Sequence, residues 1–190
     1  MAHPLGTLFE SAGIKFIQDT VEAIHPDEHT VDARSASGVA STQYGFDVDS
    51  LEAAIRLESH LEHLASLPPS PGRDTFVVCG GGFTGIELAT ELPGRFSKGD
   101  IRVILVEYAD EVGPDLEPGP RPVIMKALKD IGVEVKLGSA VTEIDSKGVT
   151  SASGEYIETM TPVWTAGVRA TPLTQQIPGA KDSLSRLHVD

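Results

Sequence analysis

The order of apolar and polar residues predicts that strands and helices alternate through much of this chain of 190 residues. Between residues 75 and 165, short apolar runs of strand length are separated by segments whose apolar positions recur at helical spacing. Alternation of this kind favours a parallel sheet with right-handed crossovers. We therefore predict an α/β fold: a Rossmann-like doubly wound parallel sheet, with a small antiparallel β-meander inserted at about residues 140–160.

Four apolar runs are the predicted parallel strands. They are Thr75–Cys79, Ile101–Glu107, Val133–Gly138 and Thr161–Gly167. A helix from about Thr84 follows the first run, and a second helix precedes the third run. The apolar positions of that second helix are Ile124, Ala127, Leu128 and Ile131.

The first part of the chain has a different pattern. Alternating apolar residues between positions 14 and 33 predict short β pieces. From Asp49 onward leucines and alanines recur at helical spacing, and this predicted helix stops before Pro68–Gly72. That stretch is rich in proline, which removes backbone donors, so it is typical of a linker.

The segment Phe76–Glu91, "FVVCGGGFTGIELATE", carries the most specific motif. Gly80, Gly82 and Gly85 match G-x-G-x-x-G between a predicted strand and a predicted helix. The first glycine permits the tight turn, the second lets a pyrophosphate approach the backbone, and the third lets the helix pack closely on the strand. A helix that begins there offers unpaired N–H groups to phosphates. A plain strand-to-helix turn is the alternative.

Glu107 favours the nucleotide interpretation. It ends the second predicted strand, about 20 residues after Gly85, where a carboxylate binds the adenine ribose in such folds. The alternative is a surface acid in an acidic protein. Because this carboxylate would repel the additional phosphate of NADPH, we predict NADH as the ligand.

Glu87 permits two interpretations. As an acid in the first turns of the helix, it could interact with the helix dipole. The same helix end is expected to face the dinucleotide, whose phosphates repel a carboxylate, so a chemical role such as proton exchange is the second interpretation.

Composition narrows the class of partner. The formal net charge of −13 disfavours nucleic acid and anionic membranes as partners. No apolar run approaches the ~20 residues that span a bilayer, and residues 1–13 lack the pattern of a signal peptide. We therefore expect an acidic, soluble, cytoplasmic protein without a transmembrane segment, and a homo-oligomer is compatible with the sequence.

Three other features receive structural interpretations. His60 and His63 share a helix face, but no third ligand accompanies them, so we predict two exposed helix histidines and no metal site. Cys79, the single cysteine, is interpreted as a small core residue and not as a redox thiol. Trp164 is interpreted as a core or sheet-end anchor.

Several stretches, in order along the chain, resemble the type II NADH dehydrogenases, flavoproteins of the pyridine nucleotide-disulfide oxidoreductase superfamily. They are "VVCGGGFTGIELATEL", "VILVEYADEVGPDLEP", "LKDIGVEVKLGSAVTEID" and "VWTAGVRATPL". The resemblance implies an enzyme that passes a hydride from NADH to FAD and then reduces a quinone. It also implies a cytoplasmic location, with the full-length family peripheral to the inner face of the membrane.

The resemblance assigns roles to named residues. The NADH pyrophosphate would be bound by Gly80, Gly81, Gly82, Phe83, Thr84 and Gly85. Glu107 would bind the adenosine ribose, and Ala166, Gly167 and Val168 would form a loop over the NADH site. Glu87 would lie near the nicotinamide and the flavin and take part in the redox and quinone step.

The resemblance also divides the chain into four parts. Residues 1–48 are expected to be a remnant of the FAD-binding domain, 49–72 a helix and proline-rich linker, 73–170 the NADH-binding Rossmann domain, and 171–190 the start of a C-terminal FAD segment. The family's own FAD-binding glycine motif near the N-terminus does not occur here. We therefore expect an excised NADH domain, and FAD binding by this chain is not expected. The alternatives are a catalytically silent NADH-binding module and another reductase of the superfamily.

Overall fold

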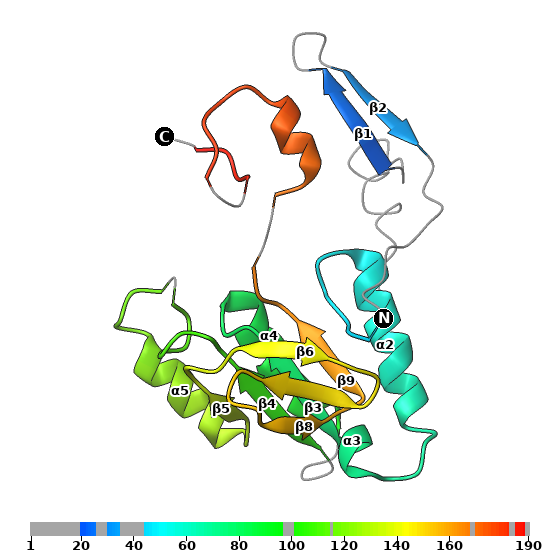
Figure 1. Cartoon of the computed structure of the whole chain (residues 1–190), viewed down its shortest axis with the longest axis vertical. Coiled ribbons are helices and arrows are strands. Elements are labelled where there is room, and N and C mark those ends of the chain that lie inside the picture. The colour runs from blue at the N-terminus through cyan, green and yellow to red at the C-terminus, as the bar shows by residue number, and fades with distance from the viewer. Residues whose placement is uncertain are drawn as a thin grey trace, which may run out of the picture. The chain divides into compact units, whose positions relative to one another are not determined.

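The computed structural model describes residues 20–25, 30–34, 44–96, 101–114, 116–167, 170–182 and 185–188. The chain divides into two compact units, which are described separately: residues 1–40 with 168–190, and residues 41–167. In the first unit, strand β1 (Thr20–His25) pairs antiparallel with β2 (Thr30–Arg34), and a 3-10 helix, η3, covers Pro172–Gln176. This strand pair confirms the β pieces predicted near the start of the chain (Figure 1).

The second unit is built on a four-stranded parallel sheet with the order β5-β4-β3-β9. The strands are β3 (Thr75–Cys79), β4 (Arg102–Val106), β5 (Glu134–Lys136) and β9 (Thr161–Trp164). Helix α4 (Phe83–Glu91), continued by the 3-10 helix η2 (Leu92–Arg95), connects β3 to β4, and α5 (Arg121–Asp130) connects β4 to β5. The predicted Rossmann-like sheet is confirmed.

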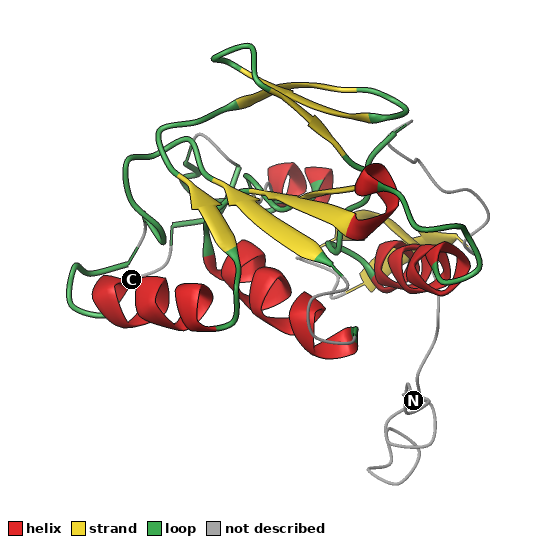
Figure 2. Cartoon of the chain, turned by 90° about the horizontal axis from the view of Figure 1, so that it is seen from below, coloured by secondary structure: helices red, strands yellow, loops and turns green. Residues whose placement is uncertain are grey.

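Alternate residues of the central strand β3 enter two different cores. Phe76 and Val78 pack with residues of α4 and α5, whereas Val77 and Cys79 belong to a second cluster with Val149. This is the two-residue period of a strand that is buried on both faces. Figure 2 shows two helices, α4 and α5, along one face of the sheet and the β-meander across the other.

The β-meander is the insertion that the sequence predicted. It consists of β6 (Val141–Ile144), β7 (Gly148–Ser151) and β8 (Tyr156–Glu158), paired antiparallel in that order. Its buried apolar side chains cover the face of the parallel sheet that α4 and α5 leave open.

Helix α2 (Leu51–Leu64) begins where the sequence predicted a helix. The hydroxyl of Ser50 accepts a hydrogen bond from the Ala53 N–H, which satisfies one of the unpaired donors of the first turn. The proline-rich stretch after α2 differs from a plain linker, because Pro71–Asp74 form a short helix, α3. Gly72 is buried and its carbonyl accepts from the Met160 N–H at 2.7 Å, so this stretch packs as part of the unit.

His60 contradicts the prediction of two exposed helix histidines. Its ring lies 4.4 Å from the ring of Phe46, and its Nε2 is 3.0 Å from the hydroxyl of the buried Thr161. The residue is half-buried because the backbone of Phe46 hydrogen-bonds to β9 and brings its ring over α2. His63 is exposed, as predicted.

This environment predicts a pH dependence of stability. Burial lowers the pKa of His60 from its ordinary value of 6.5, because it disfavours the charged imidazolium. On acidification the unfolded chain therefore binds this proton first, and stability that is present above about pH 6.5 is lost as the pH falls. We expect the melting temperature of the wild type to fall more steeply between about pH 7 and pH 5 than that of His60→Gln. His188→Gln, which replaces an exposed histidine that does not act on His60, is the control and should follow the wild type. Parallel curves for wild type and His60→Gln would contradict the assignment.

Candidate functional site

The candidate site lies where three parallel strands end side by side. In the register of the sheet, Cys79 at the end of β3 is paired with Val106 of β4 on one side and with Trp164 of β9 on the other. The strands β3, β4 and β5 follow one another to one side of β3, whereas β9 lies on the other side of β3. The strand order therefore reverses at β3. In open α/β sheets, ligands bind at the carboxyl ends of the strands at such a reversal.

The glycine loop after β3 has the backbone geometry that the motif predicts. Gly80 has a φ of +121°, and a Cβ there would lie 2.7 Å from the backbone nitrogen of Ala166. A Cβ on Gly85 would lie only 1.8 Å from the carbonyl oxygen of Gly80. Gly82, in contrast, faces open space, with no described atom within 4 Å of a Cβ built on it. Gly80 and Gly85 are therefore required by the fold, whereas the space beside Gly82 is available to a ligand.

Helix α4 begins directly at this open position. Gly82 is its N-cap residue and provides no side-chain cap for the first turn. The N–H groups of Phe83, Thr84 and Gly85 have no carbonyl partner inside the helix and face the same end. Phe83, the first residue of the helix, is 60% exposed, and the space beside Gly82 is open. Such a helix end is suited to phosphate groups.

Glu107 lies beside the loop and is only 9% exposed. One carboxylate oxygen, Oε2, accepts from the Gly81 N–H at 2.5 Å, and the other, Oε1, accepts from the Ala109 N–H at 2.8 Å. The side chain thus links the glycine loop to the loop after β4. Each carboxylate oxygen can accept a further hydrogen bond, so a ribose hydroxyl could still bind there.

The loop after β9 forms the other side of the site. The Thr165 hydroxyl lies 3.1 Å from the carbonyl oxygens of Cys79 and Gly80, and the Trp164 indole N–H donates to the Ala166 carbonyl at 2.7 Å. Trp164 is 41% exposed, which supports a sheet-end anchor and not a core residue. Gly167 has a φ of +78°. The residue after it, Val168, lies outside the described residues.

Sequence reasoning missed Thr165. The available signal was a polar residue directly after a buried strand at the carboxyl edge of the sheet, next to the predicted loop residues. Its hydrogen-bond partners are 85 and 86 residues away in the sequence, so the pattern around Thr165 could not identify them.

Glu87 lies in the second turn of α4 and not in the first, where no acid occurs. Since the dipole effect fades beyond the first turn, this position weakens the interpretation as a helix-dipole partner. The Glu87 side chain is exposed and has no hydrogen-bond or ion-pair partner within the described residues. It lies one turn beyond Phe83 on the same exposed face of α4.

Two other predictions concern reactive groups. Cys79 is 2% exposed, and burial raises the pKa of its thiol to about 12, which confirms a core residue. Within the described part of the chain, no cluster of three or more His, Cys, Asp or Glu residues could hold a metal ion.

Among the residues that the structure describes, no helix combines the length and the apolar character that crossing a membrane requires.

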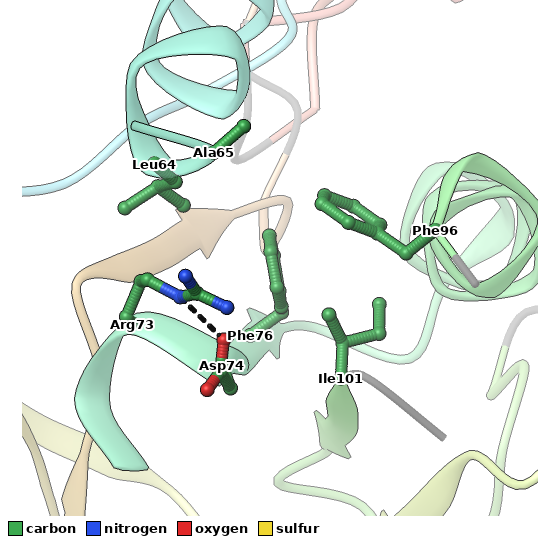
Figure 3. Close-up of a pocket in the computed structure, with 7 residues that line it drawn as sticks. All are labelled: Leu64, Ala65, Arg73, Asp74, Phe76, Phe96 and Ile101. Atoms are coloured by element: carbon green, nitrogen blue, oxygen red, sulfur yellow. Dashed lines mark hydrogen bonds and ion pairs between the residues drawn. The ribbon is translucent and has the colours of Figure 1, made fainter. Parts of the chain in front are cut away.

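A cavity of about 230 Å³ lies at the opposite edge of the sheet (Figure 3). It is lined by apolar side chains and by the ion pair of Arg73 with Asp74, whose closest atoms are 2.6 Å apart. Phe76 and Ile101 contribute from the amino-terminal ends of β3 and β4, whereas the glycine loop follows the carboxyl end of β3. This cavity is therefore separate from the candidate site.

Comparison with known protein families assigns this chain to one of them. The pyridine nucleotide-disulphide oxidoreductase family matches residues 9–190. The chain belongs to this family. One curated relative is an NADH dehydrogenase-like protein of Mycobacterium tuberculosis. It is 40% identical to this chain over 213 residues, and the alignment covers 98% of this chain. A type II NADH:quinone oxidoreductase of the same organism is 38% identical over 125 residues, which cover 58% of this chain and 27% of that protein.

Solved structures agree on the fold of this oxidoreductase-family chain. The NDH2 of Plasmodium falciparum in complex with NADH matches 84% of this chain and 42% of its own, with a TM-score of 0.62 and 15% identity. The CoADR-RHD of Bacillus anthracis matches 97% of this chain and 36% of its own, with a TM-score of 0.68 and 17% identity. The chain spans about half the length of the first curated relatives, 53% in the case of the Mycobacterium tuberculosis protein.

Proposed function

We propose that this chain is the NADH-binding part of an FAD-dependent NADH:quinone oxidoreductase. The observation that carries the proposal is the buried carboxylate of Glu107, which lies beside a glycine loop that opens α4 at the reversal of strand order. Relatives named NADH dehydrogenase-like protein and type II NADH:quinone oxidoreductase support it.

In this proposal the chain binds NADH across the carboxyl edge of the sheet. The pyrophosphate is bound at the open side of Gly82 by the free N–H groups of the first turn of α4, and Glu107 binds the adenosine ribose. The loop of Ala166, Gly167 and Val168 lies over the nucleotide. The domain boundaries predicted from the sequence, with residues 73–170 as the NADH-binding domain, belong to the same proposal.

FAD would supply the acceptor for the hydride of NADH. Among the described residues, the glycine motif that opens a helix occurs once, between β3 and α4, and the proposal assigns it to NADH. The residues that the structure describes therefore do not provide a second glycine loop of this kind, and the chain alone is not expected to hold FAD. Quinone reduction is proposed for the longer flavoprotein only.

The purified chain tests this proposal through two measurements. Calorimetric titration is expected to show saturable NADH binding, and the visible spectrum is expected to lack a flavin band. A folded chain that does not bind NADH would overturn the proposal. A yellow chain that oxidises NADH with a quinone analogue would overturn the view that the flavin site lies elsewhere.

Glu87 is proposed to act in the chemistry and not in nucleotide binding. Because its exposed side chain has no partner in the described structure, Glu87→Gln should leave folding and NADH affinity unchanged. In a flavin-containing version of the protein, we expect this substitution to lower quinone-dependent turnover by about a hundredfold, the size of a lost proton-transfer group.

Glu91→Gln is the matched control, because Glu91 lies one turn further along α4 and approaches Arg95 at 3.7 Å. This variant should turn over like the wild type. Unchanged turnover in Glu87→Gln would remove the proposed role.

A further inference from the structure

One peptide group in the glycine loop is held by side chains at both ends. The carbonyl oxygen of Gly80 lies 3.1 Å from the hydroxyl of Thr165, and the N–H of Gly81, in the same peptide, donates to Glu107. We infer that Thr165 is a positioning residue, which together with Glu107 fixes the Gly80–Gly81 peptide in its binding geometry before any nucleotide arrives.

The direction of the two contacts follows from the sheet. The peptide between Gly80 and Gly81 is trans, so its C=O and N–H point in opposite directions. Thr165 follows β9 and Glu107 follows β4, and these strands flank β3 on its two sides. The neighbouring strands therefore place one donor and one acceptor at the correct ends of a single peptide group.

In the described structure, no other hydrogen-bond donor can replace Thr165 at the Gly80 carbonyl. It is buried beneath α4, so close to Gly85 that a methyl group there would overlap with it. Within the described residues, the Thr165 hydroxyl is its only hydrogen-bond donor. Cys79, the other carbonyl within reach of this hydroxyl, already accepts from the Thr165 N–H at 2.9 Å. Removal of the hydroxyl would leave the Gly80 carbonyl buried without a donor, and rotation of the peptide would relieve that state.

Such a rotation would damage the site twice. It would withdraw the Gly81 N–H from Glu107, and it would change the backbone path that leads into Gly82, the N-cap of α4. Glycine-rich loops lose much conformational freedom when they are ordered, so a loop that is already fixed binds its ligand more tightly. The Gly81 N–H is also occupied by Glu107, which leaves the first turn of α4 as the source of donors for a phosphate.

Three variants of the whole chain test the inference. Thr165→Val keeps the shape of the side chain and removes the donor, whereas Thr165→Ser keeps the donor. Thr159→Val is the control: the Thr159 hydroxyl donates to the Thr75 carbonyl, at the far end of β3, and accepts from the Thr161 N–H, and it is more deeply buried than the half-buried Thr165. NADH affinity, melting temperature and the hydrogen exchange of the Gly81 amide are measured for each.

Thr165→Val should weaken NADH binding about tenfold, the scale of one unsatisfied buried acceptor, and should speed exchange of the Gly81 amide relative to the amides of β3. Thr165→Ser should stay within about twofold of the wild type. Thr159→Val should lower the melting temperature while NADH affinity and Gly81 exchange stay unchanged.

Equal effects of Thr165→Val and Thr159→Val on affinity, or unchanged Gly81 exchange in Thr165→Val, would overturn the inference. The affinity measurement rests on the proposed function, but the exchange measurement needs no ligand. A wild type that does not bind NADH therefore overturns the proposed function, while Gly81 exchange still decides the role of Thr165.

Discussion

Gly85→Ala is expected to abolish NADH binding and to lower the free energy of unfolding by about 3 kcal/mol. The added methyl group would lie 1.8 Å from the carbonyl oxygen of Gly80 and 2.8 Å from the hydroxyl of Thr165. Neither atom can yield easily, because the first belongs to the backbone and the second is hydrogen-bonded to it. Helix α4 must therefore move away from β3, which opens the apolar core between them. Chemical denaturation and NADH titration measure the two effects.

Gly82→Ala distinguishes a glycine loop that binds a pyrophosphate from a plain strand-to-helix turn. No described atom lies within 4 Å of a Cβ at this position, and its φ of −71° suits an alanine. The free energy of unfolding should therefore be unchanged within about 0.5 kcal/mol. The methyl group would nevertheless occupy the space proposed for the pyrophosphate, and NADH affinity should fall at least tenfold, about 1.4 kcal/mol. Gly94→Ala, also in open space, is the control for both quantities. Wild-type affinity in Gly82→Ala would favour the plain turn.

The second large effect concerns the choice between NADH and NADPH. We expect NADH to bind at least about a hundredfold more tightly, because the 2′-phosphate of NADPH would lie against the buried carboxylate of Glu107. A pair of like charges about 4 Å apart near a protein surface repel by about 4 kcal/mol, which is more than a hundredfold preference requires. Asp110 and Glu111, in the loop that follows, add charge of the same sign.

Glu107→Gln tests the source of this preference. The substitution keeps the size of the side chain and one oxygen that accepts from the Gly81 N–H, but the NH2 group that replaces Oε1 cannot accept from the Ala109 N–H. We expect weaker NADH binding and a much smaller ratio of NADH to NADPH affinity. Asp110→Asn removes an exposed charge nearby and should change the ratio by less than about threefold. A wild type that binds NADPH as tightly as NADH would contradict the prediction.

Local pattern was sufficient for the strands and the longer helices of the second unit. The apolar run Thr75–Cys79 and the leucines of α2 predicted a buried strand and an amphipathic helix, because each periodicity depends only on near neighbours. The stretch Pro71–Asp74 was predicted less well. Proline is tolerated in the first turn of a helix as well as in a linker, and the Met160 contact that holds this turn comes from far along the chain.

The sequence by itself determined the alternation of strands and helices, the glycine motif at the end of β3 and the acid at the end of β4. Each of these features depends on the spacing of residues that are close together in the sequence, so each can be recognised from its own segment alone. Only the tertiary structure decided what the polar side chains contact: His60 meets Thr161 across 101 residues, and Thr165 meets Gly80 across 85. The physical reason is that a hydrogen bond depends on strand order and register, which arise when distant segments pack together.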